Sequence, residues 1–131
     1  SNSANGSMVD PYTQENRSYP DQKPEVSAPG VLLFSTTSTQ IEPPYAYSTG
    51  TSDSTVLVTG ALALILELYG TALAGDDGVI DVEEMELVKR SLASSCDKSG
   101  TDGSPHDVRG GYGFLDAVQW STDIAFELNL A

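Results

Sequence analysis

The longest feature in the hydrophobic pattern is an apolar stretch in the middle of the chain. Between about residues 53 and 69, apolar side chains occupy nearly every face of a helix rather than one stripe. A helix that is apolar all round is normally buried all round. The pattern therefore predicts a buried helix over 53–69, with Gly70 as its C-terminal cap. Gly60, a poor helix former, indicates that another backbone packs closely against this helix.

Two short segments ahead of this helix have the composition of β-strands. Residues 31–37 are apolar and β-branched, and residues 45–48 alternate between aromatic and small side chains, with a loop over 38–44 between them. Residues 1–22 are polar and predict a loop. Residues 23–30 hold two prolines and end in glycine, which predicts an extended segment that closes in a tight turn.

The pattern after the long helix is less regular. We predict a loop over 71–80, a helix from 81 to about 93 with one apolar stripe, and a second loop over 94–111. A short helix over 115–120 and an amphipathic strand over 124–130 complete the chain. These few strands and helices supply too few layers to enclose the long apolar helix. The chain therefore has the pattern of one end of a larger α/β domain.

The start of the second helix combines turn and capping signals. Asp81 and Glu84 have the spacing of a capping box. The run from Asp77 to Glu84 also resembles the second half of a calcium-binding loop, but Leu73 and Gly75 stand where its first carboxylates belong. Calcium takes six to eight oxygens. Two interpretations remain open. One is an Asp-Gly turn that leads into a capped helix, and the other is a weak calcium site with Asp77, Asp81 and Glu84.

Charge and cysteine content narrow the classes of function. Nineteen acidic against six basic residues give a net charge of −13, which disfavours binding to nucleic acid or to anionic membranes. Such acidity suits a protein from a salt-loving source, although ordinary acidic proteins share it. The longest apolar run, residues 56–66, is shorter than the roughly 20 residues of a membrane helix, so we predict no membrane span. Cys96 is the single cysteine and excludes an internal disulfide.

Three linked motifs resemble the subtilase family of serine peptidases. Residues 23–30, Lys-Pro-Glu-Val-Ser-Ala-Pro-Gly, are similar to the family's K-P-D-V-x-A-P-G. Residues 50–52 match its G-T-S at the start of an apolar helix, and residues 111–117 are similar to its G-x-G-x-V-D-A. The resemblance implies an α/β fold: the C-terminal portion of a subtilisin-like three-layer domain with a mainly parallel sheet. Residues 1–131 would be one fragment of it, a polar loop over 1–22 and a nucleophile-bearing part over 23–131.

The same resemblance implies a role for Ser52 as the acyl-forming nucleophile. A serine hydroxyl becomes a useful nucleophile when a base takes its proton. At a helix N-terminus, free N–H groups and the positive end of the dipole favour the oxyanion that forms when a carbonyl is attacked. By resemblance the N–H of Ser52 is one oxyanion donor, and Ser27 and Thr51 have supporting roles near the oxyanion.

The chain departs from the family pattern after the nucleophile. Asp53 stands where methionine is usual, and Val56 and Leu57 replace a proline and a histidine. The charge of Asp53 would oppose the negative charge that develops in the transition state, unless its side chain turns to cap the helix. The family's catalytic Asp and His and its oxyanion Asn precede the first motif, in segments that these 131 residues do not include. His106 lies in a polar loop outside the family's histidine motif and is predicted to be a surface residue.

Two explanations follow from this incomplete triad. In the first, the chain is part of a larger or nicked endopeptidase, held to the N-terminal portion of the same domain and acting on a peptide or protein. In the second, the parent protein is a catalytically degenerate subtilase that serves as a structural or interaction component. The resemblance implies an extracellular or cell-surface location, no required cofactor and structural calcium at most.

Overall fold

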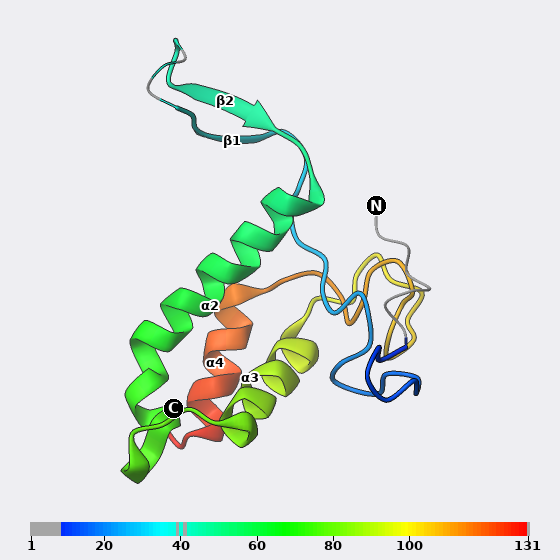
Figure 1. The fold of residues 1–131 in the computed structure, drawn as a ribbon, viewed down its shortest axis with the longest axis vertical. Coiled ribbons are helices and arrows are strands. Elements are labelled where there is room, and N and C mark those ends of the chain that lie inside the picture. Colours follow the sequence, from blue (N-terminus) through cyan, green and yellow to red (C-terminus); the bar gives the residue numbers. More distant parts are fainter. Residues whose placement is uncertain (1–8, 39, 41, 131) are drawn as a thin grey trace.

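The computed structural model describes residues 9–38, 40 and 42–130, which form a mixed arrangement of helices and strands (Figure 1). The regular elements in chain order are β1 (Leu33–Thr36), β2 (Tyr45–Ser48), α2 (Thr51–Ala74), the 3₁₀ turn η1 (Gly75–Asp77), α3 (Val82–Ser95) and α4 (Ala117–Glu127).

The two predicted strands are confirmed and form a hairpin that projects beyond the start of α2 (Figure 1). They pair antiparallel, with Phe34 opposite Tyr47 and Thr36 opposite Tyr45. Antiparallel pairing follows from the short connection over 37–44, because parallel strands need a crossover of about a dozen residues or more. In the part of the chain that the structure describes, this hairpin is the only sheet, so the mainly parallel sheet stays a prediction.

Helix α2 is longer than the hydrophobic pattern predicts. It runs on through Gly70 to Ala74, and the next residue, Gly75, has a φ of 58°, which the α-helix does not allow. The prediction of a C-cap at Gly70 and of a loop over all of 71–80 was therefore wrong. The added turn is held by Leu73, which is 4% exposed in the core. Burial of a large apolar side chain outweighs the roughly 1 kcal/mol that a helical glycine costs.

Helix α3 has the predicted capping box, since both bonds between Asp81 and Glu84 are present. Helix α4 differs from prediction, because residues 124–127 continue the helix instead of forming a strand. The apolar residues Trp120, Ile124 and Leu128 recur every four residues and so share one helix face. The hydrophobic pattern predicted a helix and a separate strand where the structure has one helix with a continuous apolar face.

The hydrophobic core lies where α3 and α4 pack against the C-terminal half of α2. Trp120 and Ile124 of α4 are 1% and 0% exposed, and Val88 of α3 is 2% exposed. The indole of Trp120 donates a hydrogen bond to the carbonyl of Val88 at 3.1 Å. Trp120 is therefore a core residue that joins α3 to α4.

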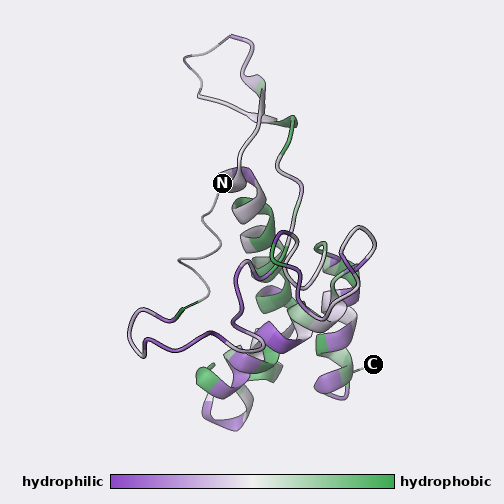
Figure 2. Ribbon diagram, turned by 90° about the vertical axis from the view of Figure 1, so that its right-hand side faces the viewer, coloured by the Kyte–Doolittle hydropathy of each residue, from purple (hydrophilic) through white to green (hydrophobic). Residues whose placement is uncertain are grey.

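Much of α2 lies outside this core. Val56, Leu64 and Leu68 are 66–68% exposed, and Figure 2 shows hydrophobic residues along the part of α2 beyond the other helices. By length and composition, residues 51–77 could cross a membrane, although a core helix of a soluble protein meets the same criterion. The described residues therefore do not provide the all-round burial that the sequence predicts for this helix.

Candidate active site

Hydrogen bonds join the first motif, residues 23–30, to the start of α2. The N–H of Gly50 donates to the carbonyl of Gly30 at 2.8 Å. The hydroxyl of Ser54 donates to the carbonyls of Ala28 and Pro29 at 3.0 and 3.1 Å. A Cβ on Gly30 would lie 2.7 Å from the carbonyl oxygen of Gly50, so the approach requires glycine. These contacts hold the extended segment beside the helix start.

The first motif is also bound to the third. The N–H of Ser27 donates to the carbonyl of Gly113 at 2.9 Å, and the N–H of Leu115 donates to the carbonyl of Ser27 at 2.7 Å. The Ser27 hydroxyl donates to the carbonyl of Gly110 at 3.1 Å. The backbone and the hydroxyl of Ser27 are thus both hydrogen-bonded to the loop between α3 and α4, residues 96–116. Through these bonds the three motifs, which are far apart in the sequence, form one connected structure.

Ser52 is the second residue of α2, and its side chain is exposed. The helix begins after Gly50, which has no side chain, and no side chain caps the first turn within the described part of the chain. An uncapped first turn keeps N–H groups and the positive end of the helix dipole available to a negative group. The Ser52 hydroxyl therefore lies in the kind of environment that stabilises an oxyanion.

The carboxylate of Asp53 turns toward the hairpin rather than capping α2. The hydroxyl of Ser48, at the end of β2, donates to Asp53 Oδ2 at 3.0 Å. Just outside the two strands, the N–H of Leu32, which precedes β1, donates to Oγ1 of Thr49, which follows β2, at 2.9 Å. Together these bonds fasten the base of the hairpin to the first turn of α2. They leave the negative charge of Asp53 next to Ser52 in the chain.

A groove of about 540 Å³ lies between the first motif, the first half of α2 and α3. Thr51 and Ser27 both line it, so the structure brings these two predicted support residues to one surface. Ser52 does not line the groove. The other lining residues are mostly apolar or small: Pro20, Pro24, Glu25, Val26, Ala28, Ser54, Thr55, Val58, Thr59, Lys89, Leu92, Ala93, Arg109 and Tyr112.

The single histidine is bound within the loops and is half-buried rather than fully on the surface. His106 Nε2 lies 2.9 Å from the carbonyl oxygen of Pro24, and its ring packs edge-on against Tyr112 at 4.9 Å. A carbonyl can only accept, so this nitrogen carries a proton. The described contacts give His106 a role in joining the 96–116 loop to the first motif.

The three weak calcium candidates bind local backbone. Asp81 Oδ1 accepts from the N–H of Glu83 at 2.8 Å, and Glu84 Oε2 accepts from the N–H of Asp81 at 3.0 Å. Asp77 Oδ1 accepts from the N–H of Val79 at 2.9 Å. Across residues 9–38, 40 and 42–130, no three His, Cys, Asp or Glu side chains are grouped to hold a metal ion. The geometry here is that of a turn and a helix cap.

The sequence model of the subtilase family matches residues 1–114 of the chain. The chain belongs to the subtilase family. The match includes the first two motifs completely and ends within the third, at Phe114. No curated protein shows significant similarity to the chain. Membership of the subtilase family supports a peptidase function of the serine type in general.

Several residues that hold the candidate site together carry no clear signal in the sequence. Ser54 and Ser48, for which no role was predicted, form with Gly30 the junction between the first motif, the hairpin and α2. The available signal was the density of hydroxyl residues around the G-T-S motif. Which hydroxyl meets which carbonyl depends on contacts between segments more than twenty residues apart.

Proposed function

We propose that this subtilase chain is the nucleophile-bearing, C-terminal part of a serine endopeptidase. The observation that carries the proposal is the exposed Ser52 hydroxyl in the first turn of an uncapped helix, in a chain of the subtilase family. The hydrogen bonds that fasten the first motif and the hairpin to this turn support a fixed position for the nucleophile. A fixed nucleophile is what acyl transfer requires.

In the proposed reaction, Ser52 Oγ attacks the carbonyl carbon of a peptide bond while a base takes its proton. The N–H of Ser52 donates to the resulting oxyanion, since it belongs to the first turn of α2. The carbon–nitrogen bond then breaks, the proton passes to the leaving amine, and an acyl-enzyme remains. Water, activated by the same base, releases the acid and restores the hydroxyl.

The base is proposed to come from the N-terminal portion of the same domain. His106 is bound to the carbonyl of Pro24, so this histidine is not placed to accept the proton of Ser52. The exposed apolar residues Val56, Leu64 and Leu68 support the same assignment, because they leave α2 with a face that another layer must cover. The parallel sheet, catalytic Asp and His, and oxyanion Asn would all lie in that portion.

Support roles for the two neighbouring hydroxyl residues form part of the proposal. Thr51 lines the groove beside the helix start, where it would contact a bound peptide or the covering portion. Ser27 would act through the backbone, since its hydroxyl holds the carbonyl of Gly110. The serine mechanism needs no cofactor, and calcium would have a structural role only. Subtilases are often secreted, and we propose an extracellular or cell-surface location for this one.

One observation favours a second candidate, a degenerate subtilase with a structural or interaction role. Asp53 directly follows Ser52, and its carboxylate accepts a hydrogen bond from Ser48 instead of capping the helix. A fixed carboxylate here would oppose the developing oxyanion. The two candidates differ in the reactivity of Ser52, because only the enzyme activates this hydroxyl.

The test is intact mass spectrometry of the native, unseparated preparation before and after treatment with a fluorophosphonate probe. We expect a companion polypeptide or a longer chain, and one adduct that maps to Ser52. Ser52→Ala should abolish the adduct, whereas Ser35→Ala, which removes an exposed hydroxyl from β1, should leave it unchanged. A companion portion with no adduct at Ser52 would establish the degenerate scaffold instead. A well-folded, unlabelled chain alone would contradict both.

A further inference from the structure

We propose that Asn16 is a site of N-linked glycosylation. The tripeptide Asn16-Arg17-Ser18 has the N-x-S pattern of an acceptor asparagine, with a residue other than proline in the middle. Because a three-residue pattern occurs often by chance, the exposure of the tripeptide and its position in the fold must support the assignment. The inference rests on the extracellular location proposed above and is independent of the catalytic role of Ser52.

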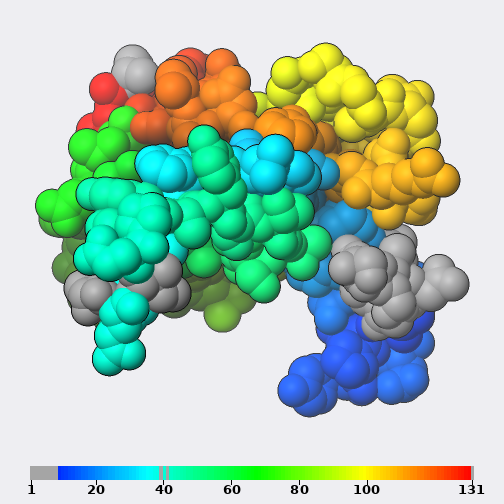
Figure 3. Space-filling model, turned by 90° about the horizontal axis from the view of Figure 1, so that it is seen from above, coloured from blue at the N-terminus to red at the C-terminus, as the bar shows by residue number. Residues whose placement is uncertain are grey.

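The tripeptide lies in a loop built by local backbone hydrogen bonds. Asp10 Oδ1 accepts from the N–H groups of Tyr12 and Thr13 at 2.7 and 3.1 Å, and the N–H of Asp10 donates to the carbonyl of Glu15 at 2.9 Å. This closed turn brings Asn16 back alongside Val9 in an isolated antiparallel bridge. In Figure 3 the same blue segment projects from the body of the molecule.

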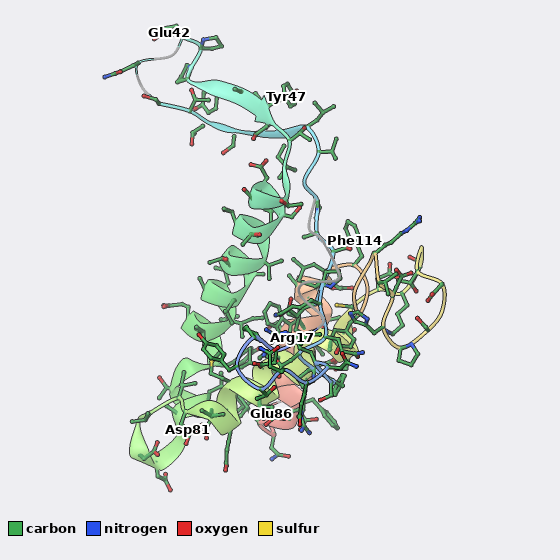
Figure 4. All side chains as sticks on the ribbon, turned by 45° about the vertical axis from the view of Figure 1, so that its right-hand side comes forward. Arg17, Glu42, Tyr47, Asp81, Glu86 and Phe114 are labelled. Carbon is green, nitrogen blue, oxygen red and sulfur yellow. The ribbon has the colours of Figure 1, made fainter. Side chains whose placement is uncertain are left out.

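The side chains of the tripeptide alternate between outward and inward positions. Asn16 and Ser18 are exposed, whereas Arg17 is half-buried and directs its guanidinium to the carboxylate of Asp10 at 3.9 Å. Arg17 is labelled in this loop in Figure 4. The acceptor amide and the hydroxyl that the reaction requires therefore both face solvent.

The loop is anchored directly after the tripeptide. The Tyr19 hydroxyl donates to the carbonyl of Arg90 at 3.2 Å, Asp21 forms an ion pair with Lys89, and Pro20 is buried. A glycan on Asn16 would extend from the exposed turn without disturbing these contacts to α3. Asparagine-linked sugars are bulky and solubilising and therefore need such a surface position in the folded protein.

The chemistry is a glycosyl transfer from a lipid diphosphate-linked oligosaccharide. The carboxamide nitrogen of Asn16 forms a bond to the anomeric carbon of the sugar, and the bond from that carbon to the lipid diphosphate breaks. The amide proton leaves with the diphosphate, so the transfer involves no oxidation or reduction. The Ser18 hydroxyl positions and polarises the amide.

The experiment is peptide mapping of the full-length protein, purified from its source or from a secreting host that attaches N-linked sugars. We expect the tryptic peptide ending at Arg17 to carry a glycan on Asn16, and enzymatic deglycosylation to convert this residue to aspartate. Asn16→Gln and Ser18→Ala should remove the modification, and Ser18→Thr should retain it. Ser52→Ala should also retain it, which separates this inference from the proposed catalysis.

Asn5-Gly6-Ser7 has the same pattern but lies outside the described residues, and it supplies the control. Asn5→Gln should leave the glycan at Asn16 in place. Recovery of the peptide with Asn16 wholly unmodified, or with sugar on Asn5 alone, would overturn the proposal, as would retention of the full-length protein in the cytosol.

Discussion

At the scale of single residues, the motif glycines are explained by the space around them. Gly111 has a φ of 69°, and a Cβ there would lie 2.5 Å from the carbonyl oxygen of Glu25. Gly113 has a φ of 138°, and a Cβ there would lie 2.5 Å from the carbonyl oxygen of Asp97. Both positions bring backbone against backbone, where no side chain can move aside. The third motif therefore contacts the first motif at Gly111 and the segment after α3 at Gly113, in places that only glycine permits.

We expect Gly111→Ala to destabilise the folded protein by more than Gly103→Ala. Both glycines have positive φ, which costs an alanine about 1–2 kcal/mol. Only Gly111 adds a backbone clash, worth a further 1–3 kcal/mol or so, because nothing lies within 4 Å of a Cβ at Gly103. Urea unfolding of the full-length variants would measure the difference, and equal losses would show that the contact with Glu25 contributes nothing.

The 96–116 loop should lose stability in acid because of Asp107. The N–H groups of Arg109, Gly110 and Asp102 bind its carboxylate and lower its pKa below the ordinary 3.8. A lowered pKa contributes stability that is present above 3.8 and lost as the pH falls through the folded value. Asp107→Asn should reduce the pH dependence of amide exchange in this loop, and Asp76→Asn should not. An unchanged profile in Asp107→Asn would contradict this account.

At the scale of elements, α2 differs from α3 and α4 in what covers it. Helices α3 and α4 bury their apolar faces against each other and against Ile65 and Leu73 of α2. Toward its N-terminus, α2 continues past this core with Val56 and Leu57 exposed. An apolar helix in this position is best explained by a further layer of the same domain, which is the N-terminal portion proposed above.

Gly60→Ala tests whether another backbone packs against α2. Nothing described lies within 4 Å of a Cβ at Gly60, so in the 131-residue chain alanine should favour the helix by about 1 kcal/mol. In the full-length protein we expect the same change to be destabilising, because the added methyl group would meet the covering layer. Circular dichroism measures the change in helix content of the 131-residue chain, and unfolding measures the change in stability of the full-length protein. Stabilisation in both settings would refute close packing at Gly60.

At the scale of the whole molecule, the described structure has a small core and an extended apolar surface. The hairpin makes few contacts with the helices and presents Phe34 and Tyr47 to solvent, at 62% and 68% exposure. On α2, Val56, Leu64 and Leu68 are exposed as well, and contiguous exposed apolar residues are typical of surfaces that contact another protein surface. The proposed N-terminal portion would cover these exposed residues.

The isolated 131-residue chain should therefore be unstable or aggregate, despite a net charge of −13 that favours solubility. We expect no cooperative thermal transition, and binding of a hydrophobic dye at low temperature. Addition of the N-terminal portion should restore a cooperative transition and reduce dye binding. A sharp two-state transition of the monomeric chain alone would overturn the proposed need for that portion.

Local sequence signals predicted the presence of helices and strands better than the residues at which they end. The Asp81–Glu84 capping box and both strands are confirmed, because each depends on neighbouring residues. The predicted C-terminal ends of α2 and α4 were wrong, because Leu73 and Ile124 extend these helices by packing into a core shared with distant segments. The candidate site shows the same division: the motif leads to Ser52 as the proposed nucleophile, whereas the hydrogen bonds around the helix start required the tertiary structure.

The sequence by itself determined the family, the place of the G-T-S motif at the start of a long apolar helix, and the order of the elements from β1 to α3. These follow from residue types at short spacing, which act through local backbone geometry. Only the tertiary structure decided that Ser54 holds the first motif, that Asp53 turns to Ser48, and that α2 is left largely uncovered. These outcomes depend on which distant surfaces meet, and the free energy of that choice is spread over many weak contacts that no single segment encodes.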